Sequence, residues 1–388
     1  MDLIHIAEII MAGSAGLVLS AVVLPRISLV SFRCRLFDQT GGRKLHTVPI
    51  PRLGGVAFFP CIMMSVLSVI VFHNLQWGGN LLDASLTVHF FVLICSLFLL
   101  YLMGMMDDLV GVRYRSKFIV QGICGAALAA SGFCIDHFHG LFGIHAVPAV
   151  VGIPFTVLVI VFILNAVNLI DGIDGLASGL GMIAFLVFGC MFACLSWWVY
   201  VYISFASFGV LVPFFRSNVF GNAGRGRKIF MGDTGSLTIG LLLAVLAIRL
   251  GMTDPVKDLV FPGAIVTAFS CLIVPMLDVV RVVIHRLRTG NSPFLPDRNH
   301  IHHKFIALGM TQRRAMVTIV GIALLFAVSN VLLVRVLSTT LLFLFDVAVW
   351  TAMHCIITVR INALRRASGS PDGQPCPQAT LSNQKEKF

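Results

Sequence analysis

Residues 148–175 read PAVVGIPFTVLVIVFILNAVNLIDGIDG, an apolar run that ends in amide and carboxylate side chains. The apolar part, 148–168, is long enough to cross a bilayer, which takes roughly 20 helical residues. Carboxylates beside hydrocarbon are costly to desolvate. The stretch therefore predicts a membrane helix whose end opens into a polar or metal-bearing cavity at the membrane boundary.

Two further acidic clusters stand at the ends of apolar segments. One is the pair Asp107-Asp108 and the other is FMGDTGS at 230–236, which contains Asp233. The chain has only 17 Asp and Glu in 388 residues, and five of the aspartates fall in these three clusters. This concentration points to a shared site.

The composition excludes an ordinary soluble domain, because 58% of the residues are hydrophobic and 12% are charged, against about 25% charged in globular chains. We expect an all-α, polytopic membrane protein with about 11 transmembrane helices. No cleavable signal peptide is expected, and residues 361–388 are predicted to be a disordered cytoplasmic tail after a membrane domain at 1–360. The predicted spans are 5–25, 53–73, 87–106, 118–135, 148–168, 178–194, 196–215, 236–253, 260–280, 316–338 and 341–359.

The net charge of +11 is not spread in the way that nucleic-acid binding would require. Alternate connections carry nearly all the Lys and Arg, which is the positive-inside pattern of membrane proteins. It predicts an external N-terminus and a cytoplasmic C-terminus. The basic segments are 26–52 with six Lys and Arg, 107–117 with three, 216–235 with four, 281–315 with seven, and the tail from 360 with five.

This topology places all three acidic clusters on the cytoplasmic face, where they can converge in one cavity. Mg²⁺ takes carboxylate and amide oxygens and shares its shell with water and substrate phosphates. Asp233 and Asn168 are candidate ligands of that kind. The alternative is helix capping, since Asn, Asp and Gly are favoured at any helix end; three clusters on one face favour a site.

Phe230, at a turn near the membrane edge, could stack on a base or pack into lipid. Two expected cytoplasmic connections carry further candidate residues. In 296–304 three histidines suggest zinc, but no cysteine is near, so phosphate binding together with Arg and Lys is favoured. In 43–55 the cations could bind an anionic lipid head or a nucleotide phosphate.

Five motifs in order, within roughly residues 40–305, resemble the polyprenyl-phosphate N-acetylhexosamine-1-phosphate transferases, the glycosyltransferase 4 family. His300-Ile-His302-His303-Lys304 matches the HexNAc branch rather than the muramoyl-pentapeptide branch, which typically reads Pro-Ile-His-His-His. Eleven helices also fit the HexNAc branch better than the usual ten of the other. The motifs are RKLHTVPIPRLGG (43–55), Asp107-Asp108, NAVNLIDGIDGLA (165–177), FMGDTGS (230–236) and DRNHIHH (297–303).

The resemblance implies that a polyprenyl-phosphate oxygen attacks the β-phosphorus of a UDP-HexNAc, giving polyprenyl-diphosphate-sugar and UMP with Mg²⁺ as cofactor, or Mn²⁺ in its place. A direct displacement and a covalent aspartyl-phosphate route both stay open, the direct one being favoured. The implied roles are metal binding by Asn168 and Asp233; catalysis by Asp107, Asp108, Asp233, His302 and His303; and substrate binding by Arg43, Lys44, His46, Asn165, Asp171, Asp174, Phe230, Asp297, Arg298 and His300.

The same resemblance implies a multi-pass protein of the bacterial inner membrane with a cytoplasmic active site, working at the first membrane step of cell-surface glycan synthesis. The expected partners are UDP-HexNAc (GlcNAc above all), undecaprenyl phosphate and membrane lipid, with no nucleic acid and with a homodimer left open. The alternatives are the muramoyl-pentapeptide transferase and a nucleotide-sugar transporter, which would carry its charges near mid-membrane.

Overall fold

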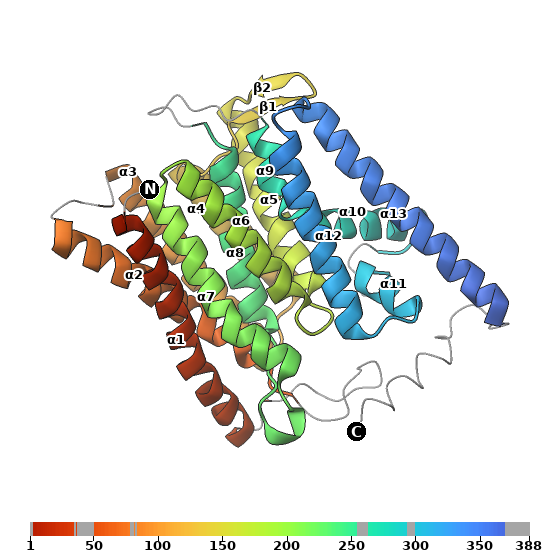
Figure 1. The fold of residues 1–388 in the computed structure, drawn as a ribbon, viewed down its shortest axis with the longest axis horizontal. Helices are drawn as coiled ribbons and strands as arrows, with labels where there is room; N and C mark the ends of the chain where they lie inside the picture. The colour runs from red at the N-terminus through yellow and green to blue at the C-terminus, as the bar shows by residue number, and fades with distance from the viewer. Residues whose placement is uncertain are drawn as a thin grey trace.

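The computed structural model describes residues 3–34, 36, 50–77, 81, 84–253, 263–292 and 299–368, and within them the chain is a bundle of helices with one small hairpin (Figure 1). The elements in chain order are α1 (Leu3–Arg33), the 3₁₀ turn η1 (Leu53–Ala57), α2 (Phe58–Trp77), α3 (Ala84–Val110), α4 (Tyr114–Ser131), β1 (His137–Leu141), β2 (Ile144–Ala146), α5 (Ala149–Ile170), α6 (Leu176–Cys194), α7 (Trp198–Phe220), the 3₁₀ turn η2 (Ala223–Arg225), α8 (Gly232–Gly251), α9 (Ala264–Ser270), α10 (Ile273–Arg288), α11 (Ile301–Ala307), α12 (Gln312–Leu333) and α13 (Thr339–Ser368).

Most of the apolar runs form helices at the predicted places. In the described part of the chain, nine helices are long and apolar enough to cross a membrane, and the bent pair α9–α10 would make a tenth. Helices suit this environment because they satisfy every backbone polar group internally. The chain is therefore a polytopic, mainly helical membrane protein. The predicted span 118–135 corresponds to α4, which is less apolar than the nine helices of membrane length. The count of eleven spans therefore stays a prediction.

The predicted span 260–280 differs from the structure, because its described part is divided into α9 and α10, which meet at 82°. Pro275 stands in the first turn of α10 and explains the break. Proline has no N–H to donate to the carbonyl of residue 271, and its ring would clash with that carbonyl in a continuous helix. The chain turns sharply at Cys271 and Leu272 as a result.

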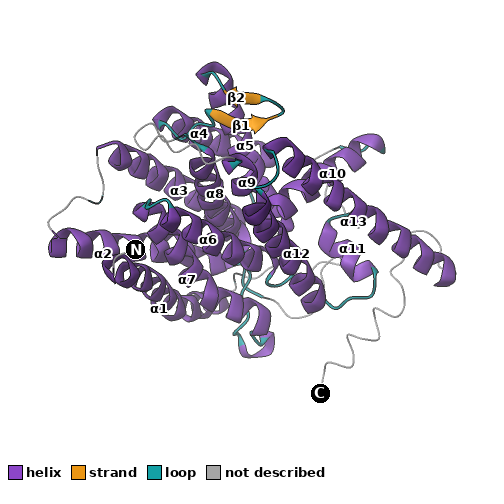
Figure 2. Ribbon diagram, turned by 45° about the horizontal axis from the view of Figure 1, so that its top comes forward, coloured by secondary structure: helices purple, strands orange, loops and turns teal. Residues whose placement is uncertain are grey.

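α8 forms the centre of the bundle and is almost entirely buried (Figures 1 and 2). It packs against α3, α5, α6 and α9, while α1 packs along α7 on the outside. The first turn of α8, Gly232-Asp-Thr-Gly-Ser, has only small side chains apart from the aspartate. Neighbouring helices can therefore approach the N-terminus of α8 closely, and this is where the candidate site forms.

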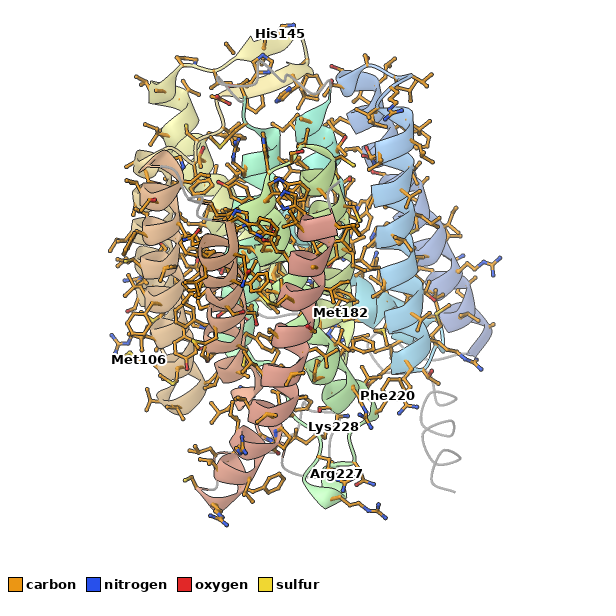
Figure 3. All side chains as sticks on the ribbon, turned by 60° about the vertical axis from the view of Figure 1, so that its left-hand side comes forward. Met106, His145, Met182, Phe220, Arg227 and Lys228 are labelled. Carbon is orange, nitrogen blue, oxygen red and sulfur yellow. The ribbon has the colours of Figure 1, made fainter. Side chains whose placement is uncertain are left out.

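The two ends of the bundle differ in chemistry. The β1–β2 hairpin closes one end, with His137 opposite Ala146 and Leu141 opposite Ile144. Arg227 and Lys228 lie at the opposite end from His145 of the hairpin (Figure 3). The sequence did not predict this hairpin, because its strands are short.

The C-terminal helix α13 lies at the edge of the bundle, where it contacts α9, α11, α12 and β1 (Figure 1). It continues to Ser368, beyond residue 360, where the membrane domain was predicted to end. The rest of the predicted tail, 369–388, lies outside the described residues.

Candidate active site

The end of α3 is joined to the start of α8 through Asp108. One carboxylate oxygen of Asp108 accepts the backbone N–H of Asp233 at 2.8 Å, and the other accepts the N–H and hydroxyl of Thr234 at 2.9 and 2.6 Å. These N–H groups have no partner within their own helix, since the first turn of any α-helix leaves its donors free. Asp108 therefore caps α8 from a different helix.

Gly232 makes this approach possible. Its φ is +69°, in the left-handed region, and a Cβ there would lie 2.5 Å from a carboxylate oxygen of Asp108. Any other residue at this position would be strained and would also push Asp108 away. The glycine of the FMGDTGS motif thus has a local structural cause.

Lys117, at the start of α4, binds two of the predicted aspartates. Its Nζ lies 2.5 Å from Asp107 and also makes an ion pair with Asp233. The other oxygen of Asp107 accepts the N–H of Val112 at 2.6 Å. Sequence analysis missed Lys117 because it was counted only among the positive-inside cations. Its one sequence signal was the short separation from Asp107.

Asn168 completes the surroundings of Asp233. The amide of Asn168, on the last turn of α5, donates to Asp233 at 2.7 Å and to the hydroxyl of Ser236 at 2.8 Å. The aspartate is therefore bound by groups from α3, α4 and α5, as three separate parts of the sequence meet at one helix N-terminus. The predicted convergence of the three acidic clusters is found in the structure.

The turn between α5 and α6 carries the other two aspartates, 171 and 174. Asp174 forms an ion pair with Lys228 at 2.5 Å. Burial, with the nearby carboxylates of Asp174, Asp233 and Asp108, raises the pKa of Asp171 to about 7. A buried carboxylate among other carboxylates favours its neutral form, since both desolvation and like charge oppose ionisation. The site thus has an excess of negative charge that a cation would relieve.

The three histidines of α11 and its start have different surroundings. His302 is buried against Gly172, where a Cβ would lie 2.2 Å from its Nε2. Burial, and then the neighbouring imidazoles of His303 and His300, lower the pKa of His302 to about 3, so its ring is neutral at physiological pH. The ring of His303 lies 4.2 Å from that of His302, measured between centroids.

His300 instead bonds to Asp278 of α10 at 2.9 Å and is buried. Asp278 also binds Arg281 at 2.8 Å, so these three groups fix α11 to α10. Asn165 makes a comparable structural contact, since its amide donates to Gln121 of α4 at 2.7 Å. In this structure the two predicted substrate contacts, His300 and Asn165, have side-chain partners within the protein.

Two sequence motifs are joined through their backbones. The N–H of Phe230 donates to the carbonyl of Pro51 at 2.8 Å, and the carbonyl of Phe230 accepts the N–H of Gly54 at 2.9 Å. The segment Pro51-Arg52-Leu53-Gly54 therefore lies directly against the turn before α8. The predicted substrate-binding residues Arg43, Lys44, His46, Asp297 and Arg298 lie outside the described residues.

The donor set at the start of α8 suits a hard cation. Asp107, Asp233 and Asn168 offer carboxylate and amide oxygens, which Mg²⁺ takes together with water and phosphate oxygens. No group of three His, Cys, Asp or Glu side chains within the described ranges gathers closely enough to hold a metal by itself. In this structure Lys117 is the cation between the two carboxylates. The chemistry of Asp107, Asp233 and Asn168 would suit a magnesium ion that completes its shell with water and substrate oxygens.

Comparison with known proteins finds relatives that cover most of this chain. The model of a family described as Glycosyl transferase family 4 matches residues 90–251. Among similar proteins is an undecaprenyl-phosphate alpha-N-acetylglucosaminyl 1-phosphate transferase of Pasteurella multocida, 32% identical over 76% of this chain and 78% of its own length. A protein of Yersinia pestis with the same name is 29% identical over 78% of each chain. A probable undecaprenyl-phosphate N-acetylglucosaminyl 1-phosphate transferase of Bacillus subtilis is 28% identical over 84% of this chain and 85% of its own.

The helical bundle, with nine helices of membrane length among the described residues and an acidic site at the start of α8, defines a multi-pass membrane protein. With 32% identity over more than three quarters of a relative, the chain belongs to glycosyl transferase family 4.

Proposed function

We propose that this protein transfers GlcNAc-1-phosphate from UDP-GlcNAc to undecaprenyl phosphate, forming undecaprenyl-diphosphate-GlcNAc and UMP. Support comes from the names of the relatives over most of the chain. The observation that carries the proposal is the cluster of Asp107, Lys117, Asn168 and Asp233 around one helix N-terminus. A cluster of oxygen ligands beside a lysine suits a diphosphate substrate, whose charge must be neutralised during transfer.

In this reaction an oxygen of the lipid phosphate attacks the β-phosphorus of the UDP-sugar. The new P–O bond forms as the bond from that phosphorus to the bridging oxygen breaks, and UMP leaves. A phosphate monoester has a second pKa of about 6, so it is mostly ionised at neutral pH without a strong base. Asp107 therefore orients the lipid phosphate rather than deprotonating it. A direct displacement is favoured over a covalent aspartyl-phosphate because both substrates can share one site.

The protein side chains supply positioning and charge. Lys117 and Lys228 form ion pairs with carboxylates in this structure. Each can exchange its carboxylate for an oxygen of the diphosphate when the substrate binds. The neutral imidazole of His302 donates or accepts a hydrogen bond with phosphate or sugar. Phe230 stacks on uracil. Asp108 acts by holding the N-terminus of α8, and with it Asp233, in position.

Mg²⁺ would be held by Asp233 and Asn168, with Asp107 beside them. Bound there, it supplies electrostatic stabilisation of the phosphate oxygens, as metal ions do in phosphoryl transfer. The amide of Asn168 can present its oxygen in place of its NH₂ group by rotating about its last torsion.

The site faces the cytoplasm in this proposal, in the inner membrane of a bacterium. Arg227 and Lys228 lie at the site end of the bundle, away from the hairpin (Figure 3), in agreement with the positive-inside rule. UDP-sugars are made in the cytoplasm, so a cytoplasmic site meets its donor directly. The fold supports eleven spans if α4 and the bent pair α9–α10 each count as one.

The test is release of UMP by the purified full-length protein with Mg²⁺ and undecaprenyl phosphate. UDP-GlcNAc, UDP-GalNAc and UDP-MurNAc-pentapeptide are offered separately, with Asp233→Ala as the inactive control. We expect release with UDP-GlcNAc only, abolished in the control and after chelation of divalent cations. Release with the pentapeptide donor alone would assign the protein to the muramoyl branch instead, and absence of release with every donor would refute the reaction.

A further inference from the structure

A cavity of about 980 Å³ lies between α10, α11 and α13. His303 reaches its edge, but none of the aspartates of the candidate active site lines it. Four cationic side chains line it: Arg281 and Arg288 from α10, Lys304 from α11 and Arg365 from α13. The described residues that line the cavity include no carboxylate. The concentration of positive charge favours an anionic occupant.

Buried polar groups around the cavity lack partners within the described part of the chain. His354 is 5% exposed and neither of its ring nitrogens has a hydrogen bond. The indole N–H of Trp350 and the Nε–H of Arg281 are also buried without an acceptor. An unsatisfied buried polar group destabilises the folded protein, and most native groups of this kind are satisfied. These three side chains line one cavity, so a ligand with several acceptor oxygens would satisfy them together.

Lys304 shows the same need for an anion. Its Nζ donates to the hydroxyl of Thr358 on α13 at 2.9 Å. Burial, followed by the charge of Arg281, lowers the pKa of Lys304 to about 8. A negative group in the cavity would offset both effects, because it would pair with the ammonium and screen it from the guanidinium.

The walls of the cavity are apolar and lead outward. Val280 and Ile284 of α10 and Val359 of α13 line it and are 40%, 43% and 67% exposed. Arg281, His285 and Arg288 follow one another at helical spacing on α10, so the helix has a basic stripe beside an apolar one. Helices with this pattern lie at the boundary between headgroups and acyl chains. The 82° bend from α9 turns α10 away from the direction of its neighbour, as such a placement requires.

We infer that the cavity between α10, α11 and α13 binds an anionic glycerophospholipid. Its phosphate and ester oxygens lie among Arg281, Lys304, Trp350 and His354, with the cations of Arg288 and Arg365 nearby, and its acyl chains follow the apolar walls outward. The site is separate from the aspartate cluster, and the inference does not depend on the reaction proposed above. A bound lipid would hold α11 against α13, on the side of α11 away from Gly172.

The experiment counts lipids bound to delipidated full-length protein by native mass spectrometry. Dioctanoyl phosphatidylglycerol is compared with dioctanoyl phosphatidylcholine, which has no net charge, and with glycerol 3-phosphate, which has no acyl chains. We expect saturable binding of one phosphatidylglycerol per chain and much weaker binding of the other two. Equal binding of phosphatidylcholine would refute the role of charge, and equal binding of glycerol 3-phosphate would refute the role of the acyl chains.

A charge-matched pair of double variants locates the site. Lys304→Gln with Arg365→Gln removes two cations from the cavity, while Arg360→Gln with Arg366→Gln removes two exposed cations of α13 that do not line it. Each Lys or Arg near an anionic lipid contributes roughly fivefold to binding, so the first pair should weaken phosphatidylglycerol binding about thirtyfold. The second pair should leave it nearly unchanged. Equal effects of the two pairs would show nonspecific attraction and overturn the assignment.

A spectroscopic readout keeps the test independent of mass spectrometry. With 5-fluorotryptophan in place of tryptophan, the ¹⁹F resonance of Trp350 is assigned through Trp350→Phe. We expect this resonance, and not those of the other three tryptophans, to shift on addition of phosphatidylglycerol. An unchanged Trp350 resonance at saturating lipid, or displacement of the lipid by an equimolar amount of undecaprenyl phosphate, would each contradict the inference.

Discussion

Asp233 is bonded through its backbone to Asp108, and through its carboxylate to Lys117 and Asn168. These partners belong to three different helices. A carboxylate held in this way loses little further freedom when it binds a ligand, which is the property that makes a preorganised site effective. The single residues around it are therefore the ones whose replacement should change the rate most.

Replacing Lys117 by Met should lower the rate of UMP release about 100-fold, the scale measured when one electrostatic group is removed from an active site. The change leaves Asp107 and Asp233 without the cation between them, and it removes a charge that would neutralise the diphosphate. Arg115→Met, which removes an exposed cation two residues away, is the matched control. Equal rates for the two variants would show that Lys117 has no part in the reaction.

Gly172→Ala should reduce activity by displacing His302, because the added Cβ would lie 2.2 Å from Nε2. His302→Ala should reduce it by a similar factor, since it removes the same imidazole. If displacement of the imidazole is the cause, the double variant will be no worse than either single variant, and a double-mutant cycle measures this. Losses that multiply would argue that Gly172 acts independently of His302.

Asp171 should make the stability of the substrate-free protein depend on pH. Burial, with the neighbouring carboxylates, raises its pKa from 3.8 to about 7, so the folded protein keeps a proton that the unfolded chain loses. The contribution is therefore fully present below about pH 4 and is lost as the pH rises through about 7. We expect the melting temperature without divalent cations to fall more steeply between pH 5 and pH 8 in the wild type than in Asp171→Asn. Parallel curves for the two proteins would show that Asp171 is not the titrating group.

At the scale of elements, α3 and α8 depend on one another. Asp107 and Asp108 are adjacent on α3, yet they face different tasks: Asp108 caps α8, while Asp107 binds Lys117. A side chain on an α-helix points about 100° away from its neighbour in sequence, so adjacent residues reach different partners. The pair Asp107-Asp108 thus combines a residue that caps α8 with one that binds the lysine of the candidate site.

This division predicts different results for the two alanine variants. Asp108→Ala should lower the free energy of unfolding by about 1–2 kcal/mol, the usual cost of losing a helix cap, and should also lower activity because Asp233 shifts. Asp107→Ala should lower activity with a smaller loss of stability. Thermal unfolding and UMP release of both variants test this division of roles. An Asp108→Ala protein as stable as the wild type would contradict the assignment of Asp108 as the cap of α8.

At the scale of the whole molecule, Arg227 and Lys228 lie at the opposite end of the bundle from His145 of the hairpin (Figure 3), and Lys228 pairs with Asp174 of the candidate site. The Lys and Arg residues gather in alternate connections, including that of Arg227 and Lys228. Cytoplasmic connections carry such an excess because translocating them is unfavourable. The whole bundle should therefore be oriented with the hairpin outside.

Single cysteines can test this orientation in a variant that lacks the ten native cysteines. We expect His145→Cys to react with a membrane-impermeant maleimide in intact cells, and Arg227→Cys to react only after the cells are permeabilised. His145 and Arg227 lie at opposite ends of the bundle (Figure 3). The reverse pattern of labelling would place the candidate site outside and exclude a cytoplasmic donor.

The sequence by itself determined the class of fold and indicated the aspartates and the asparagine that gather at the start of α8. Apolar runs of membrane length, the alternation of basic connections and the acidic ends of 87–106 and 148–168 depend only on residues near one another in the chain. The same local patterns allowed Asp107, Asp108, Asn168 and Asp233 to meet, because topology puts the ends of their helices on one face, and in the structure they do.

Only the tertiary structure decided which side chains contact one another. Lys117 between two aspartates, His300 bonded to Asp278 and the cavity beside α13 all arise where helices distant in sequence pack together. The bend at Pro275 depends on both: the proline in the sequence indicates a break in the helix, whereas the packing of neighbouring helices sets its angle of 82°. Distances and partners depend on how helix faces meet, and composition and spacing along one helix leave that undetermined.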